Sequence, residues 1–181
     1  MMTPETRARL LAVEQQLAAP TPRPLTGQTA LPIRPSGAAP MPHRVQRRRT
    51  KGWRKPADCV IVDRTSRFGN PFGIADAVRD FGYTRDEARA HVVAAFRSWL
   101  SGHRDHWLGD EGDRARERIL AGLDELAGKD LACVCALDEK CHADVLLEWA
   151  AAPDLPRRVA DARAQVDASR AERGEEPLYG A

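Results

Sequence analysis

The sequence predicts an α/β domain with a small, mostly parallel sheet and helical crossovers. Two apolar runs, Cys59–Asp63 and Leu131–Cys135, are typical of buried strands. Two helical patterns lie between them, and a helical crossover between strands favours parallel pairing. The carboxyl ends of both strands then lie at the same edge of the sheet, which is where open α/β sheets usually bind ligands.

The chain of 181 residues divides into three parts by composition. Residues 1–42 begin with a helical pattern over Pro4–Ala18. Ala19–Pro42 follows with seven prolines and no periodic apolar face, which predicts a semi-extended linker. Residues 43–152 carry the strand and helix patterns and are expected to form the compact α/β domain. Residues 153–181 are expected to form a helical appendage and a tail.

The first elements of the compact domain are a short edge strand over Arg44–Arg48 and the strand over Cys59–Asp63. The first clear helix begins at Thr84, because Thr84 and Glu87 have the spacing of a capping box. Apolar residues follow at helical spacing, namely Ala88, Val92, Ala95, Phe96 and Trp99. A second helix is expected over Asp113–Ala127, with a glycine directly after it.

The last elements are the strand over Leu131–Cys135 and a helix that begins near Cys141. The segment Ala143–Ala152 has the apolar spacing of that helix. After Pro153, Arg157–Arg173 also has helical spacing but few core-forming residues. The sequence therefore predicts a polar C-terminal helix that flanks the domain.

Composition excludes several classes of protein. Hydrophobic residues make up 43% and charged residues 30% of the chain, which suits a modest core in a soluble protein. The formal net charge of +2 gives no general sign of nucleic-acid binding. The sequence lacks both a stretch of roughly 20 apolar residues and the apolar core of a secretory signal. Four cysteines without such a signal predict a cytoplasmic location, where thiols serve metals, chemistry or packing.

The most informative segment is Asp130–Asp144, which holds three of the four cysteines. Cys133 and Cys135 are two positions apart, so on a strand their side chains leave the same face. Cys141 and His142 return one loop later, and these four side chains could close a tetrahedral zinc site. The spacing departs from the Cys-x2-Cys knuckle, and reduced cysteines also serve as buried packing residues. Zinc binding and packing are both open interpretations.

A third interpretation is a reactive site. Cys141 would lie at or near a helix N-terminus, where unpaired amides and the helix dipole favour a thiolate. His142 or Asp144 would then act as acid or base. For Asp144 the alternative is ordinary capping chemistry, because an acid in the first turn of a helix is common. The candidate catalytic residues are Cys141, His142 and Asp144.

The loop Arg64–Phe72, which follows the first buried strand, is a second candidate site. Gly69 and Asn70 tolerate unusual backbone angles, and the proline after them stiffens the turn. Ser66, Arg67 and exposed amides could hold a phosphate or a carboxylate. If the two strands are parallel, this loop lies beside the cysteine segment. The candidate ligand-binding residues of the loop are Ser66, Arg67, Gly69 and Asn70.

A basic run between Arg44 and Lys55 is the third candidate, because seven of its twelve residues are Arg or Lys. Basic residues with an interleaved aromatic, here Trp53, suit phosphate contact combined with base stacking. The run is therefore a candidate nucleic-acid contact, and Arg54 within it is a further candidate ligand-binding residue. The alternative is a solvated charged segment at a domain boundary.

Three motifs together resemble a known family. In chain order they are Arg-Arg-Arg-x-Lys-Gly-Trp-Arg-x-Pro, Ser-Arg-Phe-Gly-Asn-Pro-Phe and Lys-Asp-Leu-Ala-Cys-x-Cys-x5-Cys-His-Ala-Asp-Val-Leu. Over about Arg44–Trp149 the chain resembles the domain of unknown function numbered 4326, a family of bacteria and their phages. The resemblance places the family's Gly-Asn-Pro-Phe motif on residues 69–72 and its Cys-His-Ala-Asp motif on residues 141–144. Phe68 and Val134 stand where tryptophan is common in relatives, and both look like packing changes.

The resemblance implies a domain boundary and a site location without an activity. Occurrence in phages implies, by association, a role in nucleotide or nucleic-acid metabolism. We therefore expect a cytoplasmic domain that binds, and is a candidate to act on, a nucleotide-like or otherwise phosphorylated ligand. The alternatives are a zinc-stabilised nucleic-acid-binding module and a non-catalytic interaction domain whose terminal helices recruit a partner.

Overall fold

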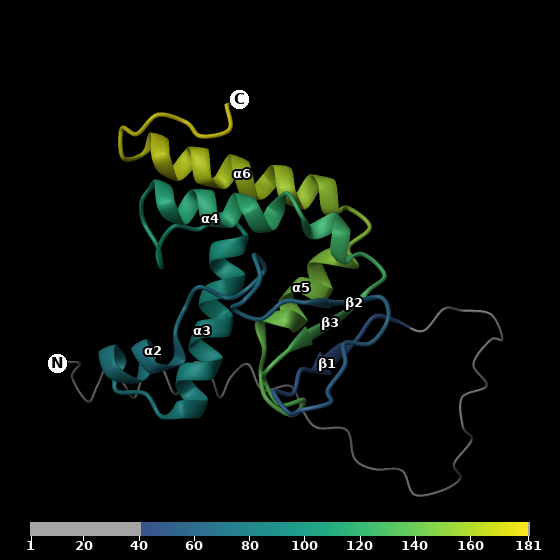
Figure 1. Cartoon of the computed structure of the whole chain (residues 1–181). Helices are drawn as coiled ribbons and strands as arrows, with labels where there is room; N and C mark the ends of the chain where they lie inside the picture. Colours follow the sequence, from purple (N-terminus) through teal and green to yellow (C-terminus); the bar gives the residue numbers. More distant parts are fainter. Residues whose placement is uncertain (1–40, 181) are drawn as a thin grey trace, which may run out of the picture. The chain divides into compact units, whose positions relative to one another are not determined.

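The computed structural model describes residues 41–180 (Figure 1). Within this range the elements follow in the order β1, β2, α2, α3, α4, η1, β3, α5 and α6, where η1 is a short 3-10 helix. The helix predicted over Pro4–Ala18 and nearly all of the linker predicted over Ala19–Pro42 lie outside the described residues. None of the described helices is long and apolar enough to cross a membrane.

The sheet has the order β1 (Arg44–Gln46), β3 (Asp130–Cys133), β2 (Cys59–Ile61), and both strand pairs are parallel. The predicted small parallel sheet is confirmed. Each strand is two residues shorter at its carboxyl end than its sequence pattern. Single backbone hydrogen bonds continue the pairing beyond the strand ends, from Arg47 N–H to the Cys133 carbonyl and from Val62 N–H to the Ala132 carbonyl. The three carboxyl ends therefore lie together at one edge.

The crossover from β2 to β3 begins with α2 (Ile74–Phe81) and α3 (Arg85–Leu100). The predicted capping box is confirmed, because the Thr84 hydroxyl accepts from the Glu87 N–H and the Glu87 carboxylate accepts from the Thr84 N–H. The sequence patterns did not predict α2. Its signal is a short amphipathic repeat that Gly82 ends at φ 68°, and the repeat consists of Ile74, Ala77, Val78 and Phe81.

The second half of the crossover is α4 (Asp110–Leu120) followed by η1 (Leu123–Leu126). The prediction of one continuous helix over Asp113–Ala127 is wrong. The α-helix starts three residues earlier, because acidic residues in its first turn complement the helix dipole. It stops before Gly122, where a side chain would come within 2.5 Å of the Arg67 guanidinium. The chain then continues as one tight 3-10 turn.

The core lies between the sheet, α3, η1 and α5 (His142–Ala150) (Figure 1). Its large apolar side chains are fully buried and include Phe96, Trp99, Leu100, Leu123, Leu131 and Leu146. Burying side chains of this size contributes roughly 1.5–3 kcal/mol each, so this cluster holds the sheet edge in place. The start of α5 is thereby fixed beside the end of β3.

The last helix, α6 (Leu155–Ala171), lies along α4 (Figure 1). Two of its small apolar residues, Ala162 and Val166, are buried. Arginines of α6 add ion pairs to this contact: Arg163 donates to Glu117, and Arg170 donates to Asp110 and Asp113. The C-terminal helix has the polar character that the sequence predicts, while the division of the chain at residue 153 stays a prediction.

Candidate functional site

A cavity of about 560 Å³ opens at the carboxyl ends of the strands. Its lining includes Gln46 and Arg49 at and after the end of β1, and eight residues between Cys133 and His142 around the end of β3. The segment after β2 contributes Asp63, Arg64, Thr65 and Asn70. The start of α2 and one face of α3 form the remaining wall. The loop after β2 and the cysteine segment therefore line one cavity.

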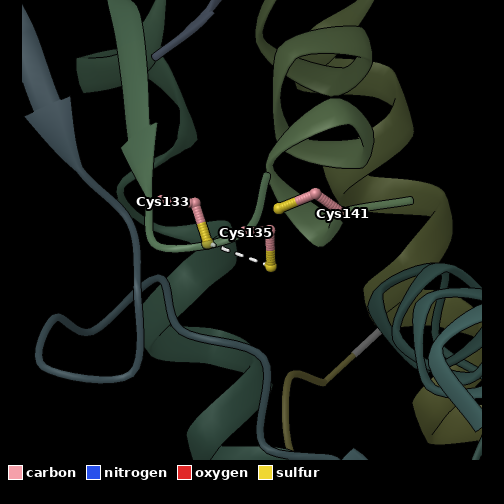
Figure 2. Close-up of side chains that lie close together, drawn as sticks. All are labelled: Cys133, Cys135 and Cys141. Carbon is pink, nitrogen blue, oxygen red and sulfur yellow. Dashed lines mark hydrogen bonds between the residues drawn. The ribbon is translucent and has the colours of Figure 1, made fainter. Parts of the chain in front are cut away.

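Three thiols gather on this lining (Figure 2). Cys133 ends β3, Cys135 follows two residues later, and Cys141 directly precedes α5. Their sulfur atoms point toward a common space and all lie within 4.8 Å of one another. The Cys133 thiol donates to the Cys135 sulfur at 3.7 Å. The cysteines are free, and their sulfurs are close enough to hold one metal ion.

Cys141 is the N-cap of α5, with an extended backbone at φ −142° and ψ 143°. Its sulfur accepts the Ala143 N–H at 3.4 Å, which satisfies one of the unpaired amides at the helix start. Cysteine takes the place of the usual Ser or Asp cap here. The helix start therefore directs an amide and the positive end of the helix dipole at the sulfur.

Hydrogen bonds distribute protons unevenly among the three thiols. The bond between Cys133 and Cys135 is the main influence on both, and it raises the pKa of Cys133 and lowers the pKa of Cys135. The pKa of Cys141 is also lowered, mainly by the neighbouring Cys133 thiol. The cluster therefore favours thiolate at Cys135 and Cys141.

His142 is buried behind Cys141. Its Nε2 lies 2.7 Å from the Val62 carbonyl oxygen, and because a carbonyl can only accept, Nε2 carries the proton. Nδ1 is then a bare acceptor, and it lies 3.8 Å from the Cys141 sulfur. The ring also packs edge-on against Phe96, with centroids 5.4 Å apart. The fold thus fixes both the tautomer and the orientation of the imidazole.

Two arginines stand beside the thiols. Arg89 of α3 is only 8% exposed, and its Nη1 donates to the Cys135 sulfur at 3.7 Å while its Nη2 donates to Glu139 at 2.8 Å. Arg44 of β1 donates to the carbonyls of Leu137 and Glu139, and its positive charge interacts favourably with Cys141. Both guanidinium groups favour negative charge on the sulfurs.

Asp63 organises the loop after β2. Its carboxylate accepts from Arg47 at 2.6 Å and from the Thr65 hydroxyl and N–H at 2.6 and 2.9 Å. Burial acts to raise the pKa of Asp63, but these hydrogen bonds outweigh it and the pKa is lowered. A Cβ at Gly69 would lie 2.6 Å from the Arg64 Cα, so only glycine lets the loop close on itself. Hydrogen bonds to Asp63 and the close backbone approach at Gly69 thus define the shape of the loop.

The predicted ligand-binding residues fall into two groups. Asn70 lines the cavity, where its amide donates to the Val92 carbonyl at 3.0 Å and its oxygen accepts from the Phe72 N–H at 2.9 Å. Ser66, Arg67, Gly69 and Arg54 lie outside the lining. The Ser66 hydroxyl donates to the Asp63 carbonyl, and Arg67 pairs with Glu125.

Among the predicted catalytic residues, Cys141 and His142 line the cavity and Asp144 lies outside its lining. The Asp144 side chain is 51% exposed and lies 3.2 Å from the Arg44 Nε. Partial burial raises the pKa of Asp144. Asp144 thus lies beside the cluster, where it pairs with Arg44.

Sequence reasoning missed one wall of the cavity. Arg85, Arg89, Val92 and Val93 of α3 line it, at the spacing i, i+4, i+7 and i+8 of a single helix face. The sequence signal that could have revealed this wall is the helical spacing of two arginines and two valines on one face of α3, whose opposite face packs in the core. Lys140 also lines the cavity and was not among the predicted residues, whereas Arg49 in the lining belongs to the predicted basic run.

A family model described as "Domain of unknown function (DUF4326)" matches residues 45–152, more than half of the chain. The chain belongs to this family. The DUF4326 match contains every residue that lines the cavity and stops before α6. No curated protein and no solved structure matches the chain. The cavity therefore lies within the matched part of this chain, and α6 follows that part.

Proposed function

We propose that this domain binds a small nucleotide-like or otherwise phosphorylated ligand in the cavity at the carboxyl edge of its sheet. One observation carries the proposal: the lining combines an apolar wall with three basic side chains, Arg49, Arg85 and Lys140, that have no hydrogen-bond or ion-pair partner among the described residues. The apolar wall consists of Phe72, Ile74, Val92 and Val93. Such a wall suits a flat, weakly polar group such as a nucleobase.

Charge supports an anionic ligand. The lining holds five basic residues, Arg49, Arg64, Arg85, Arg89 and Lys140, and two acidic ones, Asp63 and Glu139. Both carboxylates are already paired, Asp63 with Arg47 and Glu139 with Arg89. A concave site with an excess of one charge concentrates oppositely charged ligands. A volume of about 560 Å³ also fits a ligand of nucleotide size.

The same cavity supplies groups that could act on such a ligand. Cys141 offers a thiol at a helix N-terminus, and His142 Nδ1 is an acceptor for its proton. Asp144 would contribute by holding Arg44 beside the sulfur. In this extension of the proposal, Cys141 without a bound metal ion is the nucleophile and His142 its base.

The test is ligand binding measured by calorimetry and by the thermal unfolding midpoint of the full chain. We expect nucleoside monophosphates to bind more tightly than either the nucleoside or inorganic phosphate, because only the monophosphate uses both the apolar wall and the cations. At a hundredfold excess over Kd, binding would stabilise the fold by about 2.7 kcal/mol. Equal, negligible binding of all three compounds would contradict the proposal.

A matched pair of variants locates the binding. Arg85 and Lys140 line the cavity and have no hydrogen bond or ion pair within the described residues, so the double change Arg85→Ala, Lys140→Ala should weaken nucleotide binding without unfolding the chain. Arg118 and Arg157 are exposed charges away from the cavity, and the corresponding double change should leave binding as it is.

A nucleic-acid contact through Arg44–Lys55 is the second candidate. The exposed residues of this run without a hydrogen bond or ion pair in the described chain are Arg48, Arg49, Lys51 and Arg54. Arg44, Arg47 and Lys55 instead bond to other parts of the fold. Replacing Arg48, Lys51 and Arg54 by Ala should abolish binding of a single-stranded oligonucleotide if this candidate holds, and it should leave mononucleotide binding intact.

A further inference from the structure

We propose that Cys133, Cys135 and Cys141 together bind one Zn²⁺ ion, with the fourth coordination position of the ion facing the cavity. The site would combine three thiolates with an exchangeable ligand, either water or a group of a bound molecule. This inference does not depend on nucleotide binding, because it rests on the cysteine side chains alone.

The sulfur positions fit a single ion. Zinc–thiolate bonds of about 2.3 Å in a tetrahedron place two sulfurs about 3.8 Å apart. Cys133 and Cys135 already have this separation, at 3.7 Å, and all three sulfurs lie within 4.8 Å of one another. Closing the set around one ion needs movements of at most about 1 Å per pair. Thiolate ligands select soft ions such as zinc over Mg²⁺ or Ca²⁺.

The surroundings suit thiolates rather than thiols. The Cys141 sulfur accepts an amide N–H from Ala143, and the Cys135 sulfur accepts from Arg89. Three thiolates and one Zn²⁺ carry a net charge of −1, and a buried charge of this kind requires compensation. Arg44 and Arg89, whose side chains are 8% and 9% exposed, supply it beside the cluster.

Two arginine nitrogens near the cysteine cluster lack hydrogen-bond acceptors. The Nε of Arg89 and the Nη1 of Arg44 are buried, and neither has a hydrogen-bond partner within the described residues. Buried donors without partners are uncommon in folded proteins and call for an explanation. A more negative sulfur cluster, together with the water or anion that the ion would bind, provides acceptors next to both arginines.

The fourth position is the open one. All three cysteines line the cavity, so an ion between them would face it. His142 is a rival ligand: its Nδ1 lies 3.8 Å from the Cys141 sulfur, and its Nε2 is held by a carbonyl as in many metal-bound histidines. However, the atoms that lie mutually within 4.8 Å are the three sulfurs alone. Three protein ligands with an open position are the arrangement of catalytic zinc sites.

The experiment uses the untagged full chain, purified under reducing conditions and titrated with Zn²⁺ and, as a spectroscopic probe, Co²⁺. We expect one ion per chain, with thiolate-to-cobalt charge transfer and the intense visible bands of tetrahedral Co²⁺. Cys135→Ser should lower the affinity at least tenfold. The matched control is Cys59→Ser, because Cys59 is a buried cysteine at the amino end of β2, outside the cluster.

Two further measurements test whether the fourth coordination position of the ion is open. His142→Ala should still bind one Co²⁺, and azide should shift the cobalt bands of the wild-type chain, because the fourth position is exchangeable. Loss of binding in His142→Ala, or bands that azide does not change, would overturn the open position. Absence of thiolate-to-cobalt bands in a wild-type chain that is folded by circular dichroism would overturn the metal site itself. Equal affinity of the Cys135→Ser and wild-type chains would do the same.

Discussion

Two buried arginines, Arg116 of α4 and Arg89 of α3, occupy contrasting environments. Arg116 is 0% exposed, and all its nitrogens are used. It donates from Nε to the Trp99 carbonyl at 2.5 Å, from Nη1 to Asp113 at 2.9 Å and from Nη2 to the His103 carbonyl at 3.1 Å. Its guanidinium also lies over the Trp99 ring, 5.1 Å from the centroid. These partners are fixed parts of the fold, so Arg116 serves stability alone.

Arg89 is nearly as buried, but its bonding is incomplete. Its partners are Glu139 and the Cys135 sulfur, and its Nε has no partner within the described residues. It also lines the cavity, which Arg116 does not. The comparison teaches that a buried arginine is not by itself a functional sign. A buried donor that lacks an acceptor, borders a cavity and lies next to thiols is a functional sign.

The largest effect is expected on the stability of the buried ion cluster around Arg116. Asp113 is 0% exposed, and its carboxylate lies 2.9 to 3.1 Å from Arg116, Arg104 and Arg170. Asp113→Asn keeps the shape but leaves buried guanidinium groups without their counter-charge. We expect a loss of about 3–5 kcal/mol in the free energy of unfolding, measured with urea.

The control for this change is Asp161→Asn on α6. The Asp161 side chain is 71% exposed and pairs only loosely with Arg157, at 3.8 Å. An exposed pair of this kind contributes about 0–1 kcal/mol, so the control should unfold almost as the wild type does. If Asp113→Asn lost no more stability than Asp161→Asn, the buried cluster would not hold α4 and α6 together.

The second prediction concerns Arg89, which borders the cavity and has a donor without a partner among the described residues. Arg89→Gln should weaken nucleotide binding by about 1.5–3 kcal/mol, the usual contribution of a hydrogen bond to a charged group. Its cost in stability should be smaller, because Glu139 is partly exposed and can be solvated. Calorimetry on Arg89→Gln and on Arg79→Gln, an exposed arginine of α2, checks the result. A variant that unfolds readily but binds normally would reverse the assignment of Arg89.

The smallest effect is expected on the stability that Asp63 contributes at acidic pH. The pKa of Asp63 is lowered in the folded chain, so its contribution to stability is complete above the unfolded value of about 3.9. That contribution is lost as the pH falls through the lower folded pKa. Asp63→Asn should therefore flatten the decline of stability below about pH 4, measured by urea unfolding across pH. An unchanged pH profile would show that the loop does not depend on this carboxylate.

The sequence could predict the parts of the site that depend on neighbours in the chain. Cys133, Cys135 and Cys141 meet because a strand ends and a helix begins within one short segment, and both elements have clear local patterns. Parallel pairing followed from the helical crossover, and it brought the loop after β2 to the same edge. These inferences needed only periodicity and the handedness of crossovers.

The rest depends on contacts between distant parts of the chain. Arg89 meets Cys135 across 46 residues, and no local pattern marks that meeting. Arg170 reaches Asp113 across 57 residues, which turns a polar helix into one that is bound to the domain by buried charge. Arg67, expected at the ligand, instead pairs with Glu125 and lies against Phe68. The sequence shows where a charged residue occurs, but it does not show which residue that side chain pairs with in the fold.

The central claim is that the cavity at the carboxyl edge of the sheet is the ligand site. Amide chemical shifts recorded by NMR during titration with a nucleoside monophosphate test it most directly, because they locate binding without a variant. We predict shifts concentrated in residues 63–72 and 133–142 and in the first half of α3, with the amides of α4 and α6 unchanged. Shifts confined to residues 48–54, or spread evenly over the chain, would contradict the claim.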